Sequence, residues 1–317
     1  MAITGTGTHD DPFVVTTYSE LVSKITNPDS LVVCYIKIGN DINIADEYPF
    51  GDMPVLDFGV NVFLDGDGKT ITNWYCNNRD VSPIKLYSKN SHPCCMKNLN
   101  IANIIYKGLY NSNKFVTISG AGSGSNTDEV LIDNCTFVGE IYGYFMSMTW
   151  ANNSVPAIRS TAFNLLLRSV SRFISGSDMS SGLPVESCNF KIVSEGTGAS
   201  LLIFNPSYYP PQNSYFDISI PNGNPTATNN MTICDGLFSN CVIKLSTPAG
   251  SESTGTKPIF GRSNSNQKVS IINLSAATGV DCGDGTQLKE VTDQNWHDIA
   301  YLQSIGFSAG ERTGGSE

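Results

Sequence analysis

Short segments of alternating apolar and polar residues recur along the chain, and polar turns separate them. Two examples are V-L-I-D-N-C-T-F-V at 130–138 and K-V-S-I-I-N-L-S at 268–275. Apolar residues in these segments do not return every three to four positions, as they would on one face of a helix. The pattern therefore predicts an all-β chain of short strands.

A four-residue motif marks these segments at nearly constant intervals. It consists of Asn or Ser, a small residue, a variable residue and then Phe or Ile, as in N-C-T-F at 134–137. Successive motifs start 26, 27, 26 and 27 residues apart, at Asn134, Ser160, Ser187, Asn213 and Asn240. The series extends to Asn98 and Asn273, across polar insertions that have the composition of loops. Such a period predicts a solenoid, here a single-stranded parallel β-helix with coils of about 26 residues.

Strand alternation assigns each motif position to the inside or the outside of the solenoid. The second and fourth positions should both point inward, because successive side chains of a strand point to opposite faces. We expect the third position to face outward, and the Asn or Ser at the first position to make a bend. The expected inward residues are Leu99, Cys135, Thr161, Cys188, Ser214, Cys241 and Leu274 at the second position, and Ile101, Phe137, Phe163, Phe190, Phe216 and Ile243 at the fourth. The expected outward residues are Asn100, Thr136, Ala162, Asn189, Tyr215 and Val242.

The position before each motif forms a column in which the sign of the charge alternates. Its members are Lys97, Asp133, Arg159, Glu186 and Gln212. Stacked at strand spacing, they would form a partly exposed ladder of ion pairs that helps to fix the register of the coils, with little free energy from each pair. The alternative interpretation is a row of substrate-binding residues.

Both ends of the chain carry the signals of short helical caps. We expect a helix over 18–25 with Thr17 as N-cap and Glu20 three residues on. A second helix should follow Thr292 and stop at Gly306. Its apolar residues are Trp296, Ile299, Ala300 and Leu302. The chain is thus divided into an N-terminal cap (1–30), a parallel β-helix (31–285) and a C-terminal helix with a flexible tail (286–317).

Composition narrows the classes of partner. Only 15% of the 317 residues are charged, and the net charge is −10 with no cluster of Lys and Arg. We expect no nucleic-acid partner, because phosphate contacts need concentrated cations. No apolar run is long enough to span a bilayer, and no basic and apolar segment at the N-terminus marks a signal peptide. The expectation is synthesis in a cytoplasm and no membrane partner.

Neither the cysteines nor the glycine-rich segment at 65–70 predicts a cofactor or a metal. The nine cysteines are odd in number and are expected to be free, buried thiols. Cys135, Cys188 and Cys241 would lie on alternate coils about 9.6 Å apart, too far for disulfides. D-G-D-G-K-T at 65–70 has Phe63 where a P-loop needs Gly and Cys76 where an EF-hand needs Glu, so it is interpreted as a turn.

The segment V-F-L-D-G-D-G-K-T-I-T-N at 62–73, together with the inward stacks and the Asn positions, resembles the pectate-lyase-like right-handed parallel β-helix proteins. The resemblance covers about residues 31–285 and implies the fold but not a function. The opening of the chain is similar to those of bacterial and phage β-helix proteins. The segment 291–307 is similar to the C-terminal segments of phage structural proteins.

Glycosidases of this fold use paired carboxylates, and its lyases use carboxylates that bind calcium together with a basic residue. If the chain is an enzyme, the candidate catalytic residues are Asp133, Arg159 and Glu186, with Arg168 and Arg172 in the same coils. Arg159 would, however, neutralise both carboxylates. Aromatic side chains in expected loops and in the terminal helix are the candidates for contact with a partner or a glycan, namely Trp150, Tyr208, Tyr209 and Trp296.

These features together predict a non-enzymatic bacteriophage virion protein made in the host cytoplasm. A capsid decoration protein of the head is preferred over a tail appendage, because no coiled-coil stalk or receptor domain is evident. The expected partner is the major capsid protein or another virion protein, or further copies of the chain, for example in a trimer. The alternatives are a polysaccharide lyase or glycoside hydrolase, or a glycan-binding protein, that acts on host surface carbohydrate.

Overall fold

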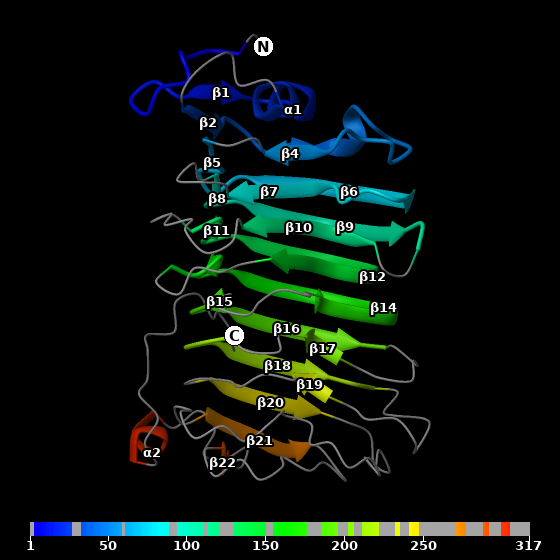
Figure 1. The fold of residues 1–317 in the computed structure, drawn as a ribbon, viewed down its shortest axis with the longest axis vertical. Coiled ribbons are helices and arrows are strands. Elements are labelled where there is room, and N and C mark those ends of the chain that lie inside the picture. Colours follow the sequence, from blue (N-terminus) through cyan, green and yellow to red (C-terminus); the bar gives the residue numbers. More distant parts are fainter. Residues whose placement is uncertain are drawn as a thin grey trace.

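Strands of successive coils lie directly above one another and form a parallel β-helix (Figure 1). The computed structural model describes residues 3–26, 33–58, 61–88, 94–110, 113–120, 130–149, 155–175, 185–195, 202–205, 211–221, 232–234, 241–246, 270–276, 288–291 and 299–304. The pairings between the strands of its two sheets are parallel, as stacked coils require. The all-β solenoid predicted from the repeat is confirmed.

The first sheet is built from seven short strands, one from each successive coil. Their order in the sheet is also their order in the chain. They are β1 (Phe13–Val15), β2 (Cys34–Ile38), β5 (Val62–Asp65), β8 (Cys95–Lys97), β11 (Ile132–Asp133), β13 (Ile158–Arg159) and β15 (Val185–Glu186).

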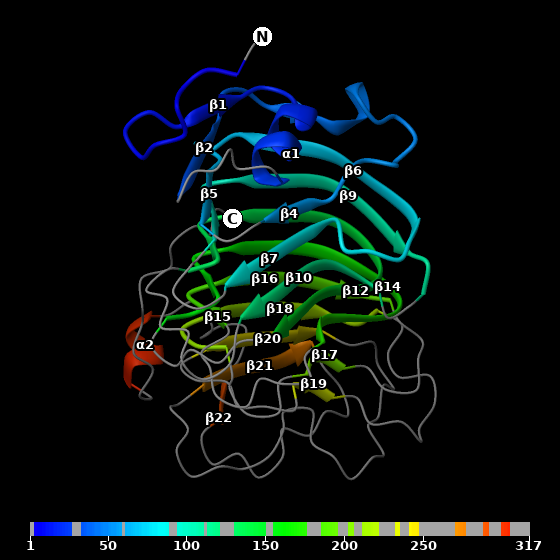
Figure 2. The same ribbon diagram turned by 45° about the horizontal axis from the view of Figure 1, so that its top comes forward.

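The second sheet has fifteen strands in two adjoining columns, which the long strands β12 and β14 join. One column holds β3 (Ile42–Asn43), β6 (Thr70–Arg79), β9 (Asn100–Gly108), β12 (Thr136–Thr149), β14 (Ala162–Ser175), β16 (Asn189–Ser194), β18 (Tyr215–Ser219), β20 (Val242–Ser246), β21 (Ser270–Ala276) and β22 (Leu288–Val291). The other continues through β4 (Leu56–Phe58), β7 (Ile84–Ser88), β10 (Lys114–Gly120), β17 (Leu202–Asn205) and β19 (Thr232–Cys234). Figure 2 shows the long strands β6, β9, β12 and β14 curving around one side of the molecule.

The register of the central coils is the predicted one. Phe137 pairs with Phe163, and the pairing continues through Phe190 and Phe216 to Ile243. The second and fourth motif positions in these coils are buried, as expected. The third position is half-buried in five coils. Val242 pairs in register with Tyr215 of this column, as predicted, but it is only 4% exposed, so its side chain is covered.

The extension of the repeat to Asn273 is also wrong. Ile243 pairs with Ile272, and Asn273 pairs with Lys244 in the middle of strand β21. The bend residue of this coil therefore lies before Asn273, and Leu274 does not hold the second motif position. The sequence alone does not distinguish an Asn within a strand from an Asn at a bend, which explains the error. Asn240 lies outside the described residues.

The bends before the second sheet have the left-handed backbone that the Asn and Ser residues predict. The angle φ lies between 50° and 53° at Asn98, Asn134, Ser160, Ser187 and Asn213. Small polar residues at the next position satisfy the carbonyl groups of the bend. The Thr161 hydroxyl donates to the Arg159 carbonyl (2.8 Å), and the Cys135 thiol donates to that of Asp133 (3.3 Å). The Cys, Thr and Ser of this column thus have one structural role.

Two columns of phenyl rings fill the core of the middle coils. The first is the predicted stack, in which Phe190 and Phe216 lie with ring centroids 4.5 Å apart and nearly parallel. The second, from the other side of the coils, contains Phe115, Phe145 and Phe173. Rings of the two columns meet edge to face, for example Phe163 and Phe173 at 4.9 Å and 82°. Such contacts add to the stabilisation from burial itself.

A helix covers the N-terminal end of the core, at the top of Figure 1. Helix α1 (Tyr18–Thr26) has the predicted capping box: the Glu20 amide donates to the Thr17 hydroxyl (3.2 Å), and the Thr17 amide donates to the Glu20 carboxylate (3.3 Å). Tyr18, Leu21 and Ile25 are buried beneath it.

The short helices elsewhere are η1 (Ile44–Asp46), a 3-10 turn, and α2 (Ile299–Ser304) beside the lower coils. Helix α2 matches the second half of the predicted C-terminal helix. The N-cap Thr292 and the stop at Gly306 lie outside the described residues. No helix in the described ranges is both long and apolar enough to cross a membrane.

Candidate functional site

The outer face of the seven-stranded sheet carries a column of six charges whose sign alternates from one coil to the next. Each charged residue stands in register with its neighbours on the adjacent strands. We call this column the charge ladder. Its members, from the N-terminal end, are Lys37, Asp65, Lys97, Asp133, Arg159 and Glu186, and Gln212 follows through an isolated bridge to Glu186.

Ion pairs join members of the charge ladder. Arg159 donates two parallel hydrogen bonds to Asp133, from Nε to Oδ1 (3.2 Å) and from Nη2 to Oδ2 (2.6 Å). Lys97 lies 3.4 Å from the carboxylate of Asp65. Both pairs are partly exposed, so each contributes on the order of 1 kcal/mol or less to stability. Because the charges stand in register on successive strands, the charge ladder helps to align the coils.

The structure alters the titration of Asp65, a carboxylate of the charge ladder. Partial burial alone would raise its pKa. Hydrogen bonds from the Asn98 amide (3.0 Å) and the Asp67 backbone (2.9 Å), together with the charge of Lys97, instead hold the pKa below its ordinary value. Asp65 is therefore an anion across the neutral range and cannot act there as a general acid.

The three candidate catalytic residues do come together. Arg159 is paired with Asp133, as expected, whereas Glu186 accepts a hydrogen bond from the Asn213 amide (3.3 Å). Arg159 stands on β13, between Asp133 on β11 and Glu186 on β15. The strands that carry the two carboxylates are thus separated by two strand spacings, about 9.6 Å. This exceeds the distance of about 5.5 Å in retaining glycosidases and is close to the upper end, about 9.5 Å, of the range in inverting ones. The hydrogen bond to Asp133 raises the pKa of Arg159 further, so this guanidinium cannot remove a proton from a substrate.

A second cluster of opposite charges lies on the outer face of the fifteen-stranded sheet. Arg168 on β14 is held between Glu140 and Glu195, donating to both carboxylates. Sequence analysis grouped Arg168 with the candidate catalytic residues, but its partners come from β12 and from the end of β16. The side chain of Arg172 lies outside the described residues. Asp133 and Arg159 link two adjacent coils, whereas this cluster links three.

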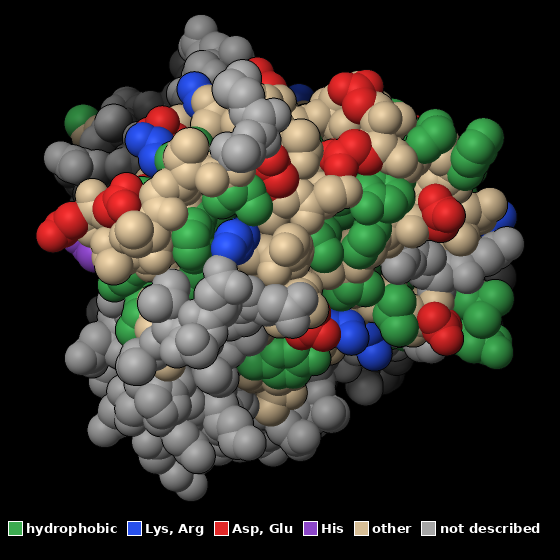
Figure 3. All heavy atoms as spheres, turned by 90° about the horizontal axis from the view of Figure 1, so that it is seen from above, with side chains coloured by type: hydrophobic (Ala, Val, Ile, Leu, Met, Phe, Trp, Pro, Cys, Tyr) green, Lys and Arg blue, Asp and Glu red, His purple; other side chains and the backbone are tan. Residues whose placement is uncertain are grey.

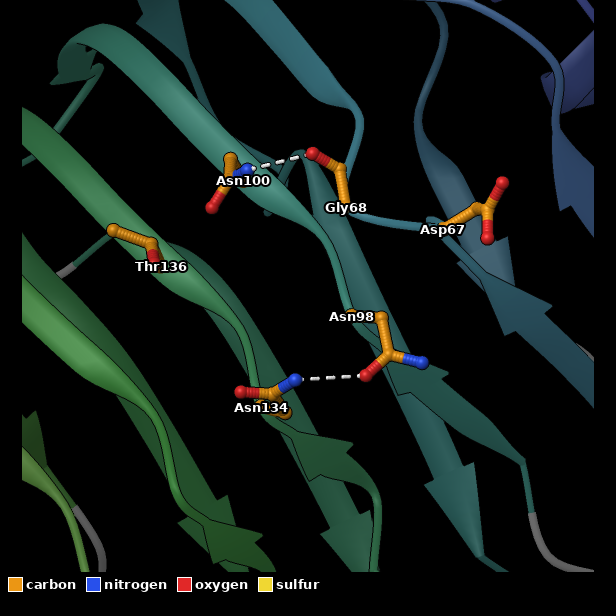
Figure 4. Close-up of a pocket in the computed structure, with 6 residues that line it drawn as sticks. All are labelled: Asp67, Gly68, Asn98, Asn100, Asn134 and Thr136. Carbon is orange, nitrogen blue, oxygen red and sulfur yellow. Dashed lines mark hydrogen bonds between the residues drawn. The ribbon is translucent and has the colours of Figure 1, made fainter. Parts of the chain in front are cut away.

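A shallow, open groove beside the charge ladder is lined by amide, hydroxyl and carboxylate groups (Figure 4). Its volume is about 320 Å³. Within it, Nδ2 of Asn134 donates to Oδ1 of Asn98 (2.8 Å), and Nδ2 of Asn100 donates to the Gly68 carbonyl (3.0 Å). The lining residues are Asp67, Gly68, Asn98, Asn100, Asn134 and Thr136. These groups can exchange hydrogen bonds with sugar hydroxyls. The carboxylate among them, that of Asp67, is paired with Lys37 (3.1 Å).

The free cysteine thiols that the structure describes are buried, which lowers their reactivity. Burial raises the pKa of Cys94, Cys135 and Cys188 to about 12. The reactive form of cysteine is the thiolate, so none of these three can serve as a nucleophile near neutral pH. Among the described residues, no three His, Cys, Asp or Glu side chains gather into a group that could hold a metal ion.

The predicted contact residues lie beyond what the structure describes. Trp150, Tyr208, Tyr209 and Trp296 all fall outside the described ranges. The structure therefore does not test them, and they remain predictions.

Two members of the charge ladder, Lys37 and Asp65, were missed in the sequence. Asp65 precedes Gly66, which occupies the place that Asn98 takes in the next coil. A Cβ on Gly66 would lie 2.5 Å from the Asn98 carbonyl, so this bend excludes the Asn or Ser that marks the others. The usable signal was the alternation of charge itself, continued upstream at intervals of about 30 residues.

Comparison with known proteins identifies a solved structure with a similar fold, but no family. No family model matches the sequence, and no curated protein matches it. A solved structure that is similar is the "putative immunoglobulin A1 protease from Bacteroides ovatus". The two share 16% sequence identity, with 84% of each chain covered and a TM-score of 0.51. At this identity the likeness shows a shared fold alone.

Proposed function

We propose that the protein is a non-enzymatic structural component of a bacteriophage virion, with decoration of the head preferred over a place in the tail. The observation that carries the non-enzymatic part is the bidentate pair of Asp133 and Arg159. A general acid needs a raised pKa, and a general base must be free to accept a proton. In this pair the guanidinium is instead hydrogen-bonded to the carboxylate through both of its oxygens.

The architecture suits a structural role. Ion pairs and an amide ladder bind each coil to the next on the outside, and phenyl columns do so inside. A rod locked in this way presents regularly spaced side chains on fixed faces, which favours binding to another ordered surface. The virion assignment rests on the terminal segments that resemble phage proteins. The partner we propose is the major capsid protein or another virion protein.

The second candidate is a protein that binds host surface carbohydrate, with or without turnover. The groove lined by Asn98, Asn100 and Asn134 favours it, because several amide groups there face solvent on a rigid backbone. A polysaccharide lyase or glycoside hydrolase would need, in addition, a second catalytic group beside Glu186, the candidate carboxylate that accepts a hydrogen bond from the Asn213 amide (3.3 Å).

Quantitative mass spectrometry of purified particles from the protein's source tests the proposal. We expect a fixed number of copies relative to the major capsid protein. In parallel, the purified protein is incubated with host surface polysaccharide, with Asp133→Asn as the matched variant. No unsaturated or reducing ends should appear with either protein. Absence from the particles, or release of oligosaccharides that Asp133→Asn abolishes, would contradict the proposal.

A further inference from the structure

The bends of three successive coils form the groove beside the charge ladder (Figure 4). Asn100 on β9 pairs in register with Thr136 on β12, and the bend residues Asn98 and Asn134 stand two positions earlier in the same coils. The turn of the preceding coil completes the lining. We call this groove the amide groove, and its lining residues are Asp67, Gly68, Asn98, Asn100, Asn134 and Thr136.

Two amide oxygens of the amide groove are open to a ligand. Nδ2 of Asn100 donates to the Gly68 carbonyl (3.0 Å), and Nδ2 of Asn134 donates to Oδ1 of Asn98 (2.8 Å). Figure 4 shows the oxygens of Asn100 and Asn134 turned away from these two bonds. Neither oxygen accepts a hydrogen bond from any residue that the structure describes. Each of the two amides also keeps a second N–H that these bonds do not use.

Hydrogen bonds fix the side chains of the amide groove before any ligand binds. Asn98, which accepts from Asn134, donates in turn to Oδ1 of Asp65 (3.0 Å). Asn98 and Asn134 also share the left-handed backbone of the bends, with φ of 53° and 50°. The amides therefore lose little conformational entropy when a ligand binds, which makes a small number of hydrogen bonds more effective.

The charges around the amide groove balance. Five segments lead from the first sheet to the second in its three coils and in the coil on either side, namely 37–42, 65–70, 97–100, 133–136 and 159–162. Their cations are Lys37, Lys69, Lys97 and Arg159, and their carboxylates are Asp41, Asp65, Asp67 and Asp133. By contrast, the whole chain has a net charge of −10, and Figure 3 shows that acidic side chains outnumber basic ones at the N-terminal end. The amide groove is thus a neutral region of an acidic protein.

We propose that the amide groove binds a neutral sugar unit through hydrogen bonds. A sugar hydroxyl both donates and accepts, and so does an amide with an open oxygen and an unused N–H. A metal cation is disfavoured because Lys37 already pairs with Asp67 (3.1 Å). An acidic sugar would meet no excess of positive charge there. The volume of about 320 Å³ lies at the lower end of the range for small-molecule sites, about 300–1,000 Å³.

Binding at the amide groove should be weak. None of its six lining residues is aromatic, so no ring among them can stack on the sugar, and the groove is open to solvent. A few hydrogen bonds, each with a small net contribution, correspond to a dissociation constant on the order of 1 mM. A neutral sugar is the ligand class of the second candidate function, on which this proposal rests, and it is independent of a place in the virion.

Saturation-transfer difference NMR of the full chain tests the neutral-sugar site. The probes are trisaccharides of glucose, galactose, mannose and N-acetylglucosamine, with trigalacturonic acid as the acidic counterpart. At least one neutral probe should receive saturation, and the acidic one should not. Asn100→Val with Asn134→Gly removes both open oxygens and should weaken binding about tenfold. Glycine tolerates the left-handed bend and valine suits a strand, so the fold should be preserved.

The matched control is Asn189→Val with Asn213→Gly. These two residues hold the same motif positions as Asn100 and Asn134 but in later coils, outside the amide groove, and Asn213 has the same φ of 50°. The control variant should bind the neutral probe as the wild type does. Thermal unfolding of both double variants monitors the fold.

Side-chain amide resonances of the wild type give a second readout that needs no variant. A bound neutral probe should shift those of Asn98, Asn100 and Asn134 and leave those of Asn189 and Asn213 in place. No binding of any neutral probe at about 10 mM would overturn the proposal, as would preference for the acidic probe or binding that survives Asn100→Val with Asn134→Gly.

The number of copies in purified particles is a separate result. A chain that is present in particles but binds no neutral sugar would reject the sugar site and leave the virion role standing. A chain that binds the sugar but is absent from particles would reject the virion role and leave the sugar site standing.

Discussion

Burial decides the chemistry of the cysteines in the coils. Cys135 and Cys188 point into the core, where their thiols donate to carbonyl groups of the bend (3.3 and 3.2 Å). Because burial raises the pKa of each thiol to about 12, the thiolate is scarce at neutral pH. These residues act as small core residues that also satisfy a polar backbone group.

We therefore predict that Cys94, Cys135 and Cys188 resist alkylation in the native protein. Iodoacetamide treatment at pH 8, followed by peptide mapping, should leave these three thiols unmodified. The same treatment in denaturant should modify all three and serves as the control. Rapid modification of any of them in the native state would show that the thiol is accessible and would contradict the proposed packing.

Asp65 should make stability depend on acid. Its pKa is lowered in the folded state, so its contribution is present above the unfolded value of about 3.9 and is lost as pH falls through the folded value. Asp65→Asn should lower the melting temperature at pH 7, and the difference from wild type should shrink below about pH 4. Asp10→Asn, at an exposed carboxylate near the N-terminus, is the control. A difference that persists unchanged into strong acid would contradict this role for Asp65.

At the residue scale, the sequence predicts the Asn and Ser residues that the left-handed bends require, and few of the other positions. Asn98, Asn134 and Ser160 could be assigned to bends because few residues adopt a positive φ. Asn273 could not be excluded as a bend residue, because the sequence does not distinguish an Asn in a strand from an Asn at a bend. The pairing of Asp133 with Arg159 followed from column order and opposite charge. Lys37 and Asp65 were missed because the residues that follow them, Ile38 and Gly66, are not the Asn or Ser that marks the other bends.

Among the elements, the coils are joined by two phenyl columns that interlock. The predicted column was visible because each Phe follows a bend at a fixed offset. The second column could not be predicted in this way. Phe115, Phe145 and Phe173 are 30 and 28 residues apart and follow no marked bend, because segments between the bends vary in length. The length of those segments, and hence the second column, needed the structure.

Phe163 lies where the two columns meet and should be the most sensitive of these rings. It packs against Phe137 and Phe190 in its own column and against Phe145 and Phe173 in the other. Phe163→Ala should lower the free energy of unfolding by about 3–5 kcal/mol, because it leaves a cavity among four rings. Urea denaturation monitored by circular dichroism measures the change.

The adjacent outward residue provides the control for Phe163. Asn164 is exposed on the same strand, so Asn164→Ala should change the free energy of unfolding by about 0.5 kcal/mol or less. Similar losses for both variants would mean that the strand, and not the ring, is responsible. A loss below about 1 kcal/mol for Phe163→Ala would contradict the interlocked core.

On the scale of the whole molecule, a solenoid must protect its open end from adding further strands. At the N-terminal end, the Val14 amide of β1 donates to the Thr4 carbonyl (2.9 Å), which occupies the edge of the first strand. Helix α1 covers the core there, and Tyr18 meets Trp74 edge to face at 5.7 Å. Association is thereby directed away from this end and toward the lateral faces.

The lateral faces have distinct characters that the sequence only partly predicted. The face with the charge ladder pairs several of its charges, whereas Phe50 and Tyr110 are exposed aromatic side chains in turns. The charge ladder was predicted in outline from the column before each motif. The exposure of Phe50 and Tyr110 was not, because no position of the repeat marks the turns that carry them.

The most direct test of the central claim is a cryo-EM reconstruction of particles purified from the protein's source. We expect the stacked coils of this chain as density at a fixed, repeated position on the particle, with the head preferred over the tail. Particles that lack the chain, combined with release of oligosaccharides from host glycans by the purified protein, would contradict a non-enzymatic structural role.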